Sequence, residues 1–291
     1  SVFFMSVNLS GSKGGFVVVV GDVPSGHSSS YEVDSRHFAR FAEVPLLEPA
    51  TFQEAKEMTK YAFALSEQLG LVVMLRCPTR ICHARGNVTL GEIARPEKKA
   101  HFDTGRVFAS HSLLHPLLHQ KVARAEAAFE ESRFNWYTGP EDAKTVIVTC
   151  GTGWLYSQEA VKVLGLEDKV GVLKIGTTWP LPRQWLLQYL AKVDAVIFIE
   201  EVDPFLEQNV QIAAAQGLGR AITYYGLRSG HVGGAAGPGV GEMSSDLVIK
   251  ALAGIFGVER RARPDDYVGK ATVHLPAGMP GRELAFCAGC P

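Results

Sequence analysis

The sequence predicts an α/β fold made of two parallel-sheet α/β domains. Short apolar runs of strand length alternate with segments that carry helical periodicity or helix-capping residues, which is the pattern of parallel strands joined by crossover helices. The chain has 291 residues, of which 46% are apolar. At roughly 150 residues per domain, this length favours two domains with sizeable cores.

The first block of the chain consists of a strand, a helix and a second strand. Phe16–Val20 is an apolar run between two glycines, as in a strand that is buried on both faces. Thr51-Phe-Gln-Glu54 is a capping box, which predicts a helix that continues through apolar residues at helical spacing to Gly70. Leu71–Arg76 follows as the next strand.

The second block repeats this alternation over a longer stretch. Helices are expected to begin near Ser157, Pro182 and Pro204, with another over Met243–Phe256, and proline suits the first turn of a helix. The predicted strands between them are Thr145–Thr149, Val170–Ile175, Ala195–Glu200 and Ala221–Tyr225.

Four segments are therefore expected along the chain. Residues 1–90 form the first α/β unit and 91–142 an interdomain connection with a helix at Ala123–Glu131. Residues 143–258 form the second domain, and 259–291 a Pro/Gly-rich linker with the start of a further domain. One strand–helix–strand unit is too little sheet for a stable core, so the chain is expected to be an internal fragment.

Charge and composition exclude several classes of function. Lys and Arg number 29 against 30 Asp and Glu, a net charge of −1, whereas a nucleic-acid footprint needs a basic surface. No apolar run approaches the roughly 20 residues that span a bilayer, so no membrane association is expected. Five cysteines in a chain this long do not make a disulfide framework, which favours a reducing, cytoplasmic compartment.

Two motifs favour a structural interpretation. Cys150-Gly-Thr-Gly153 lies between a strand and a helix, but Tyr156 takes the place of the third glycine of a dinucleotide fingerprint, so a tight turn is the expected role. His111, His115 and His119 are spaced four apart. We expect packed or solvated histidines rather than a zinc site, because Pro116 should interrupt the helix and no cysteine or carboxylate completes a ligand set.

The carboxylates of Glu200-Glu201-Val-Asp203 crowd the end of a predicted strand, where α/β active sites often lie. They have two possible roles. They could perform acid/base work or bind magnesium. Alternatively, one caps the helix that follows Pro204 and another pairs with a basic neighbour.

The loop after the first strand is the best internal candidate for a binding site. His27, Ser28 and Ser29 follow that strand, and Asp34 and Arg36 come shortly afterwards. Arginine holds a carboxylate through two parallel hydrogen bonds, while Ser and His each donate one, so this loop suits an anionic ligand. At the end of the chain, Cys287-Ala-Gly-Cys290-Pro is half of a metal site, because two thiolates can bind iron or zinc only with further ligands.

Several stretches, taken in order along the chain, resemble one family. The sequence is similar to the large (alpha) subunit of indolepyruvate (arylpyruvate):ferredoxin oxidoreductase, of the thiamine-diphosphate-dependent 2-oxoacid:ferredoxin oxidoreductases. The stretches that carry this resemblance are Lys13-Gly-Gly-Phe-Val-Val-Val-Val20, Asp22-Val-Pro-Ser-Gly-His-Ser-Ser29, Asp34-Ser-Arg36, Pro45-Leu-Leu-Glu-Pro49, Leu75-Arg-Cys-Pro-Thr-Arg80, His83-Ala-Arg-Gly86, Lys174-Ile-Gly-Thr-Thr-Trp-Pro-Leu-Pro182, Phe198-Ile-Glu-Glu-Val-Asp-Pro-Phe-Leu-Glu207 and Cys287-Ala-Gly-Cys-Pro291. Where the family commonly has Ser-Gln-Asn-Glu-Gln-Asp, this chain has Ser29-Ser-Tyr-Glu-Val-Asp34, which leaves the substrate preference open.

The resemblance implies a role for each segment. Residues 1–90 would be the later part of a pyrimidine-binding thiamine domain, 143–258 a transketolase C-terminal-like domain, and 259–291 a linker and the start of the diphosphate-binding domain. Cys287 and Cys290 would contribute iron–sulfur ligands, and His27, Ser28, Ser29, Asp34 and Arg36 would face the substrate or the pyrimidine. The family's activating glutamate would precede Ser1 and its magnesium–diphosphate site would follow Pro291, so no catalytic residue is assigned within the chain.

The implied reaction is oxidative decarboxylation of an aryl 2-oxoacid to an acyl-CoA, with reduction of ferredoxin. In the complete protein the cofactors would be thiamine diphosphate, Mg²⁺ and [4Fe-4S] clusters, and the partners a small beta subunit, ferredoxin and coenzyme A. Two alternatives remain open: a non-catalytic scaffold or truncated copy that binds partner subunits, and a non-oxidative transketolase-like transferase. The Cys-Pro ending argues against the transferase.

Overall fold

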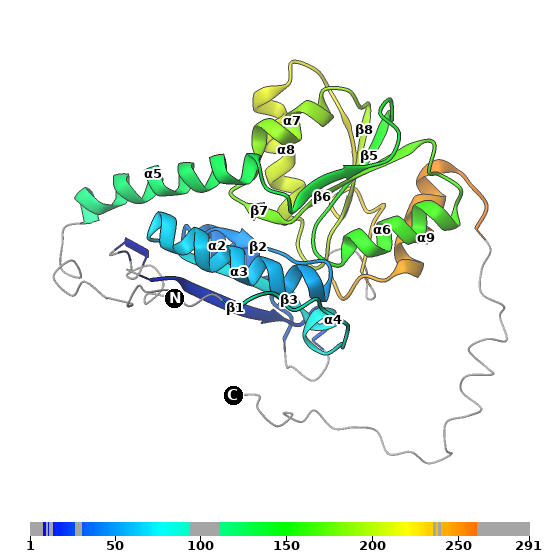
Figure 1. The fold of residues 1–291 in the computed structure, drawn as a ribbon. Helices are drawn as coiled ribbons and strands as arrows, with labels where there is room; N and C mark the ends of the chain where they lie inside the picture. Colours follow the sequence, from blue (N-terminus) through cyan, green and yellow to red (C-terminus); the bar gives the residue numbers. More distant parts are fainter. Residues whose placement is uncertain are drawn as a thin grey trace, which may run out of the picture.

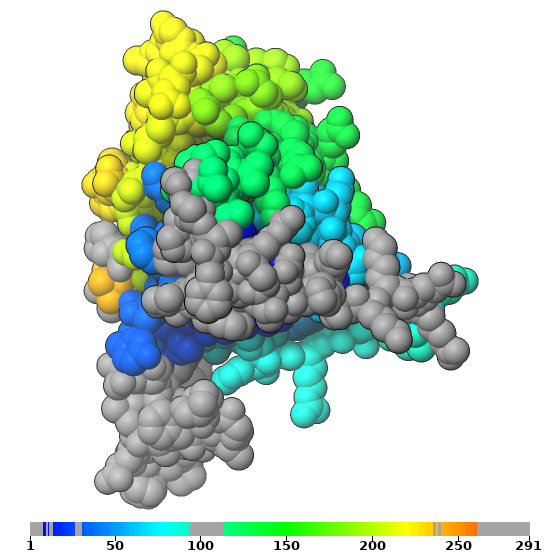
Figure 2. Space-filling model, turned by 90° about the vertical axis from the view of Figure 1, so that its left-hand side faces the viewer, coloured from blue at the N-terminus to red at the C-terminus, as the bar shows by residue number. Residues whose placement is uncertain are grey.

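The computed structural model describes residues 8–9, 11, 14–26, 31–93, 111–234, 237 and 240–260. Within them, two mixed sheets with flanking helices form one α/β body, with the second half of the chain seated on the first (Figure 1). Figure 2 shows residues of the two halves in direct contact over one face. The predicted α/β class is confirmed.

A four-stranded sheet organises the first half of the protein, with the strand order β1-β3-β2-β7. Strands β1, β3 and β2 run parallel, while β7 joins β2 in the antiparallel direction. The elements of this half are β1 (Phe16–Asp22), α2 (Arg36–Phe41), β2 (Leu46–Leu47), α3 (Phe52–Leu69), β3 (Val72–Pro78), α4 (Thr79–Cys82) and α5 (His111–Glu130).

The two faces of this sheet are covered by different helices. Alternate residues of β3 face opposite sides, so Val73 and Leu75 pack with α3 and α5, whereas Val72 and Met74 pack with α2. Thr51 accepts a hydrogen bond from the Glu54 backbone amide, 3.2 Å away, which confirms the predicted cap at the start of α3. Gly70 ends the helix in the left-handed conformation, as predicted.

A five-stranded sheet in the order β4-β6-β5-β8-β9 organises the second half. Strands β6, β5, β8 and β9 are parallel, and β4 pairs with β6 in the antiparallel direction. The elements are β4 (Asn135–Thr138), β5 (Thr145–Thr149), α6 (Gly153–Val163), β6 (Val170–Ile175), β7 (Thr177–Trp179), α7 (Arg183–Leu190), β8 (Ala195–Ile199), α8 (Phe205–Gly217), β9 (Thr223–Tyr225) and α9 (Ser245–Phe256).

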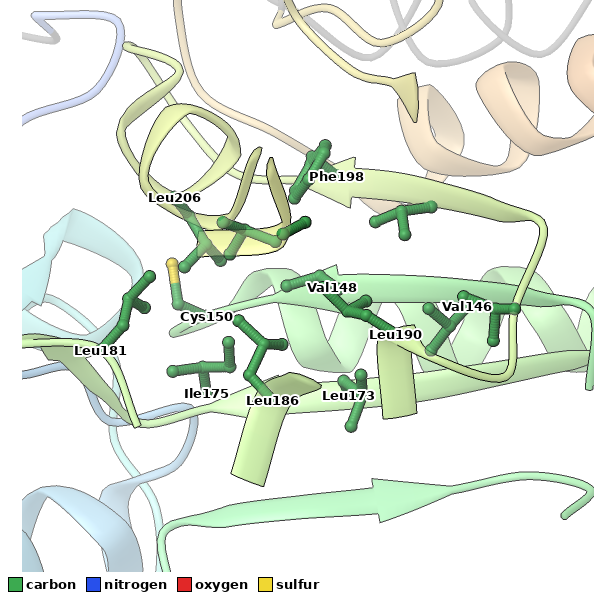
Figure 3. Close-up of a cluster of buried hydrophobic side chains, with 14 residues drawn as sticks. Val146, Val148, Cys150, Leu173, Ile175, Leu181, Leu186, Leu190, Phe198 and Leu206 are labelled. Atoms are coloured by element: carbon green, nitrogen blue, oxygen red, sulfur yellow. The ribbon is translucent and has the colours of Figure 1, made fainter. Parts of the chain in front are cut away.

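Helices cover both faces of the second sheet. Helices α7 and α8 pack on one face through Leu186, Leu190 and Leu206, in the apolar cluster drawn in Figure 3. Helices α6 and α9 pack on the other face, with Val161 and Val248 among the buried side chains. Among the helices of the described residues, none combines the length and apolar composition needed to cross a membrane.

Strand β7 ties the two halves together. It follows β6 of the second sheet in the chain, yet it pairs with β2 of the first sheet. The first sheet therefore takes one of its four strands from the second half, which supplies the extra sheet that the strand–helix–strand unit lacked. Strand β4 falls in the 91–142 segment and joins the second sheet.

Glycines in the turn after β5 have steric roles. Gly151 has a φ of +50°, and a Cβ on Gly153 would lie 2.9 Å from the Ile199 carbonyl oxygen and 2.5 Å from Thr149 Oγ1. The two glycines thus allow a sharp turn and close packing of α6 on β8. This supports the tight-turn interpretation of Cys150–Gly153.

Replacing Gly153 with alanine is expected to lower the free energy of unfolding by about 1–3 kcal/mol, because backbone atoms must move to admit the methyl group. Gly254 in α9 is the matched control, since a Cβ there meets no atom within 4 Å. Gly254→Ala should be neutral or stabilise by up to about 1 kcal/mol. Urea unfolding of both variants measures the difference, and equal stabilities would contradict the steric explanation.

Candidate functional site

Charged side chains from both halves meet at the carboxyl ends of the parallel strands. Asp22 ends β1, Arg76 lies near the end of β3, Glu48 follows β2 and Glu200 follows β8. Asp34 comes from the segment between β1 and α2, and Arg36 is the first residue of α2. We call these six residues the buried charge cluster, because each is less than a tenth exposed.

Arg36 connects the two halves of the protein through its guanidinium group. Its Nε donates to Asp34 Oδ1 at 2.8 Å, and its Nη1 donates to Glu200 Oε2 at 2.6 Å. Its Nη2 donates to Asp34 Oδ2 and to the carbonyl oxygens of Glu201 and Asp203, at 2.5, 2.7 and 2.9 Å. Every nitrogen of the guanidinium group is therefore bonded to a protein acceptor.

Arg76 of β3 connects the ends of the three parallel strands of the first sheet. Its Nε donates to Asp22 Oδ2 at 2.5 Å and its Nη1 to Glu48 Oε2 at 2.6 Å. The same Asp22 oxygen accepts hydrogen bonds from the backbone amide and hydroxyl of Ser35, both at 2.9 Å. Asp22 thus fixes the residue that precedes Arg36.

Burial and pairing set the protonation of the cluster. Burial acts to raise the pKa of Asp34, but the charges of Arg36 and Arg76 and the bonds from Arg36 outweigh it and lower that pKa to about 2. Burial raises the pKa of Glu200 to about 7, against the opposing pull of Arg36 and two backbone amides. For Arg36 itself, burial is outweighed by Asp34 and Glu200, so its pKa lies well above the ordinary value.

Cys150 marks the boundary between the charge cluster and the apolar core. Its Sγ lies 3.8 Å from Arg36 Nη1, and Figure 3 shows the sulfur beside Leu206 at the end of the apolar cluster. Burial raises the pKa of this thiol well above its ordinary value. Cys150 is therefore a neutral, buried thiol that packs as a small apolar side chain.

A second buried ion pair reinforces the contact between the halves. Lys174 Nζ of β6 donates to Glu54 Oε1 at the start of α3, 2.6 Å away, and lies 4.4 Å from the centre of the Trp136 ring. Glu54 Oε2 accepts from the Ala50 amide at 2.6 Å. Burial lowers the pKa of Lys174. The cap of α3 thus also binds the second sheet.

The loop after β1 is held at both ends by the segment before α9. Glu32 accepts hydrogen bonds from the backbone amides of Ser25 and Gly241, at 2.5 and 3.0 Å. Ser25 Oγ accepts one from the amide of Glu242 at 2.6 Å, and Glu242 is paired with Arg80 of α4 at 2.8 Å. This loop therefore lies against the second half of the chain.

The predicted binding residues fall into two groups. His27, Ser28 and Ser29, and likewise Cys287 and Cys290, lie outside the described residues. Asp34 and Arg36 lie together, but in this conformation they bond to each other and to the second half. A substrate contact from Arg36 would require one of these bonds to break, so that role stays a prediction.

The two alternatives for Glu200 can be compared directly. Its carboxylate accepts hydrogen bonds from the backbone amides of Leu206 and Glu207, at 2.8 and 2.7 Å, at the start of α8. The same carboxylate pairs with Arg36. Glu201 accepts from the Met243 amide at 3.0 Å. The capping and pairing interpretation therefore accounts for Glu200, which performs both tasks, whereas Glu201 bonds to the segment before α9.

The charge cluster does not fit an anionic ligand. Four carboxylates face two guanidinium groups, so the cluster carries an excess of acidic groups that would repel a carboxylate or a phosphate. Among the described residues, its unpartnered buried atoms are Arg76 Nη2 and Glu48 Oε1. One donor and one acceptor suffice for a water molecule or a small polar group, and they do not form a diphosphate–magnesium cradle.

Sequence reasoning missed Asp22, Glu48, Arg76 and Glu54 as members of this region. The available signal was indirect: Asp22, Glu48 and Arg76 each lie within a stretch that carries the family resemblance. Their partners are distant in sequence, and Arg36 and Glu200 are 164 positions apart. Five of the resembling stretches thus contribute a residue to the buried charge cluster.

Two premises of the prediction for the α5 histidines are wrong. Pro116 does not interrupt α5, which runs from His111 to Glu130 with the proline inside it. Pro116 lies in the second turn, where it removes one backbone hydrogen bond. Glu43, which follows α2, brings a carboxylate to His115 and His119.

Comparisons with known proteins give consistent results. Residues 135–256 match the family described as indolepyruvate oxidoreductase domain. The chain is 37% identical over 302 residues to the indolepyruvate oxidoreductase subunit IorA of Thermococcus kodakarensis, and 35% identical over 298 residues to that of Pyrococcus horikoshii. These alignments cover 99% of the chain but 44% of each relative, so the chain spans less than half the length of these curated relatives.

The fold is similar to that of a solved 2-oxoglutarate:ferredoxin oxidoreductase from Magnetococcus marinus. The TM-score is 0.50 at 14% sequence identity, over 84% of this chain and 45% of that chain. At this identity the likeness concerns the fold alone, which it supports as α/β.

Proposed function

Because the chain belongs to the family of indolepyruvate oxidoreductase IorA subunits, we propose that it is part of an enzyme that oxidatively decarboxylates aryl 2-oxoacids. The products are an acyl-CoA and reduced ferredoxin. The observation that carries the proposal is the identity of 35–37% to two IorA subunits over 99% of the chain. The presence of residues from five resembling stretches in one buried charge cluster supports it.

Within this enzyme, the described residues act as a frame. Arg36 and Lys174 bind the first sheet to the second, and Glu32 anchors the loop after β1. His27, Ser28 and Ser29 follow Gly26 directly in sequence. We assign to these three residues the contact with the substrate or with the pyrimidine end of the cofactor.

The cofactors of the proposed enzyme are thiamine diphosphate, Mg²⁺ and [4Fe-4S] clusters. Thiamine diphosphate stabilises the carbanion left by decarboxylation, and the clusters carry the electrons onward. The buried charge cluster does not suit a diphosphate, and we assign the cofactor site to other parts of the complete protein. Cys287 and Cys290 would bind one iron–sulfur cluster together with further ligands.

The partners proposed for the complete protein are a small beta subunit, ferredoxin and coenzyme A. A cytoplasmic location is proposed from cysteine usage, since reduced thiols suit that compartment.

Anaerobic spectroscopy of the native complex tests the proposal. Visible spectra are recorded before and after addition of indolepyruvate with coenzyme A. We expect a brown iron–sulfur band that bleaches with both compounds and persists when either is omitted. 2-Oxoglutarate with coenzyme A is the control for substrate class. A colourless protein would favour a scaffold or a transketolase-like transferase. Bleaching with 2-oxoglutarate and coenzyme A, but not with indolepyruvate and coenzyme A, would contradict the aryl specificity.

A further inference from the structure

Two histidines of α5 and a carboxylate from the turn after α2 converge at the surface of the first half. Glu43 Oε2 lies 3.1 Å from His115 Nε2, and Glu43 Oε1 lies 2.9 Å from His119 Nε2. The imidazole rings are 4.3 Å apart between centroids. All three ligand atoms lie within 4.8 Å of one another.

The helix that carries the histidines is fixed beside this group. Leu118, between the two histidines in sequence, is buried in the core under α3, and Lys121 Nζ donates to the Gly70 carbonyl oxygen at 2.9 Å. His115 and His119 are one helical turn apart and therefore lie on the same side of α5. The spacing presents two imidazoles together, as in helical zinc sites with histidines at i and i+4.

Glu43 occupies a backbone position that favours glycine. Helix α2 ends in a Schellman arrangement, in which the Glu43 amide donates to the Arg40 carbonyl and the Val44 amide to the Ala39 carbonyl, at 3.3 and 3.0 Å. Glu43 is the left-handed residue of this turn, with a φ of +55°. A glutamate here is strained relative to glycine, which points to a use for its side chain.

We propose that Glu43, His115 and His119 bind a divalent transition-metal ion of the zinc class. Two imidazoles and one carboxylate form a ligand set that zinc accepts, with a further position open to water. The carboxylate–imidazole separations are close to the roughly 3.3 Å between ligands of one tetrahedral zinc ion. The ion would fasten α5 to the turn after α2, the helix that begins at Arg36. This site is independent of the proposed enzymatic activity.

A second group of possible metal ligands does not form a metal site. Asp34, His37 and Asp203 also approach one another, but both oxygens of Asp34 are bonded to Arg36. That leaves His37 with Asp203, at 3.3 Å, as a single histidine–carboxylate pair. His37 is therefore the matched control for the proposed site.

Metal titration of the complete protein tests the proposal. Zinc-free wild type, Glu43→Gly, His119→Gln and His37→Asn are titrated with Zn²⁺ and Co²⁺, and Mg²⁺ is the control ion. Cobalt absorption separates the sites, because thiolate ligands add a charge-transfer band that imidazole and carboxylate ligands lack. Thermal unfolding with and without Zn²⁺ provides the second measurement.

We expect wild type and His37→Asn to bind one equivalent of Co²⁺ without thiolate absorption, and Glu43→Gly and His119→Gln to bind it at least tenfold more weakly. Zn²⁺ should raise the unfolding temperature of wild type and His37→Asn by the same amount. In Glu43→Gly and His119→Gln, the part of this rise that comes from the proposed site should be absent. Zinc-free Glu43→Gly should be at least as stable as zinc-free wild type, because glycine relieves the turn, so loss of binding cannot be attributed to unfolding. Equal Co²⁺ binding by all four proteins, or loss of binding in His37→Asn alone, would overturn the assignment.

Discussion

Replacement of Arg36 by methionine is expected to lower the free energy of unfolding by about 3–5 kcal/mol, because it leaves buried carboxylates without their partner. Asp34 and Glu200 both bond to this guanidinium group, at 2.5 and 2.6 Å, and all three side chains are fully buried. Two backbone carbonyls of the second half would also lose their donor. The contact between the halves should weaken most.

Arg40 provides the matched control for this experiment. It lies on the same helix, α2, and its Nη1 donates to Asn209 Oδ1 of α8 at 3.1 Å in an exposed position. Arg40→Met should therefore cost less than about 1 kcal/mol. Denaturant unfolding, followed by tryptophan fluorescence and circular dichroism, compares the two variants. Similar losses of unfolding free energy in the two variants would show that the buried ion pairs of Arg36 stabilise the protein no more than the exposed hydrogen bond of Arg40.

The lysine variant separates a framing role from a substrate contact. Arg36→Lys keeps the charge but cannot reach Asp34, Glu200 and both carbonyls together, because an ammonium lacks the planar fork of a guanidinium. We expect a clear loss of stability at little cost to the KM of the proposed enzyme for a 2-oxoacid. A raised KM with unchanged stability would instead support the predicted contact between Arg36 and substrate.

The strands and helices with strong local signals were predictable from the sequence. Val146–Val148 and Val196–Ile199 are apolar runs of strand length, and both are strand cores in the structure. The caps at Thr51 and Gly70 depend on residues a few positions apart, so short-range chemistry determines them. By contrast, β7 has three residues and its partner β2 has two, which is too short for periodicity to show.

The buried contacts could not be predicted, because their partners are distant in the chain. Lys174 and Glu54 are 120 positions apart, and the sequence around either residue does not indicate the other as its partner. The same holds for Glu43 and His115, which the fold joins across 72 positions. The sequence places Asp34 and Arg36 in one candidate binding loop, but it could not show that acceptors of the second half bond to the guanidinium group of Arg36.

Acid should weaken the protein through Asp34. The folded pKa of this carboxyl, about 2, lies below its ordinary value of 3.8, so folding favours the charged form. The resulting stabilisation, about 2 kcal/mol, is complete above pH 4 and is lost as the pH falls towards 2. Asp34→Asn should abolish that dependence, whereas Asp194→Asn, at an exposed aspartate paired with Arg220 at 3.6 Å, should retain it.

Glu200 should act in the opposite direction at higher pH. Burial raises its pKa from 4.5 to about 7, so folding favours the protonated form. Stability from this group is complete below pH 4.5 and declines by about 3 kcal/mol as the pH rises through 7. Unfolding midpoints measured from pH 2 to 8 should therefore show one loss of stability below pH 4 and a second one above pH 4.5. Glu200→Gln should remove only the loss above pH 4.5. A wild-type profile that stays level from pH 4.5 to 7 would mean that Arg36 keeps Glu200 ionised throughout, and that the cluster is bound by full charge pairs.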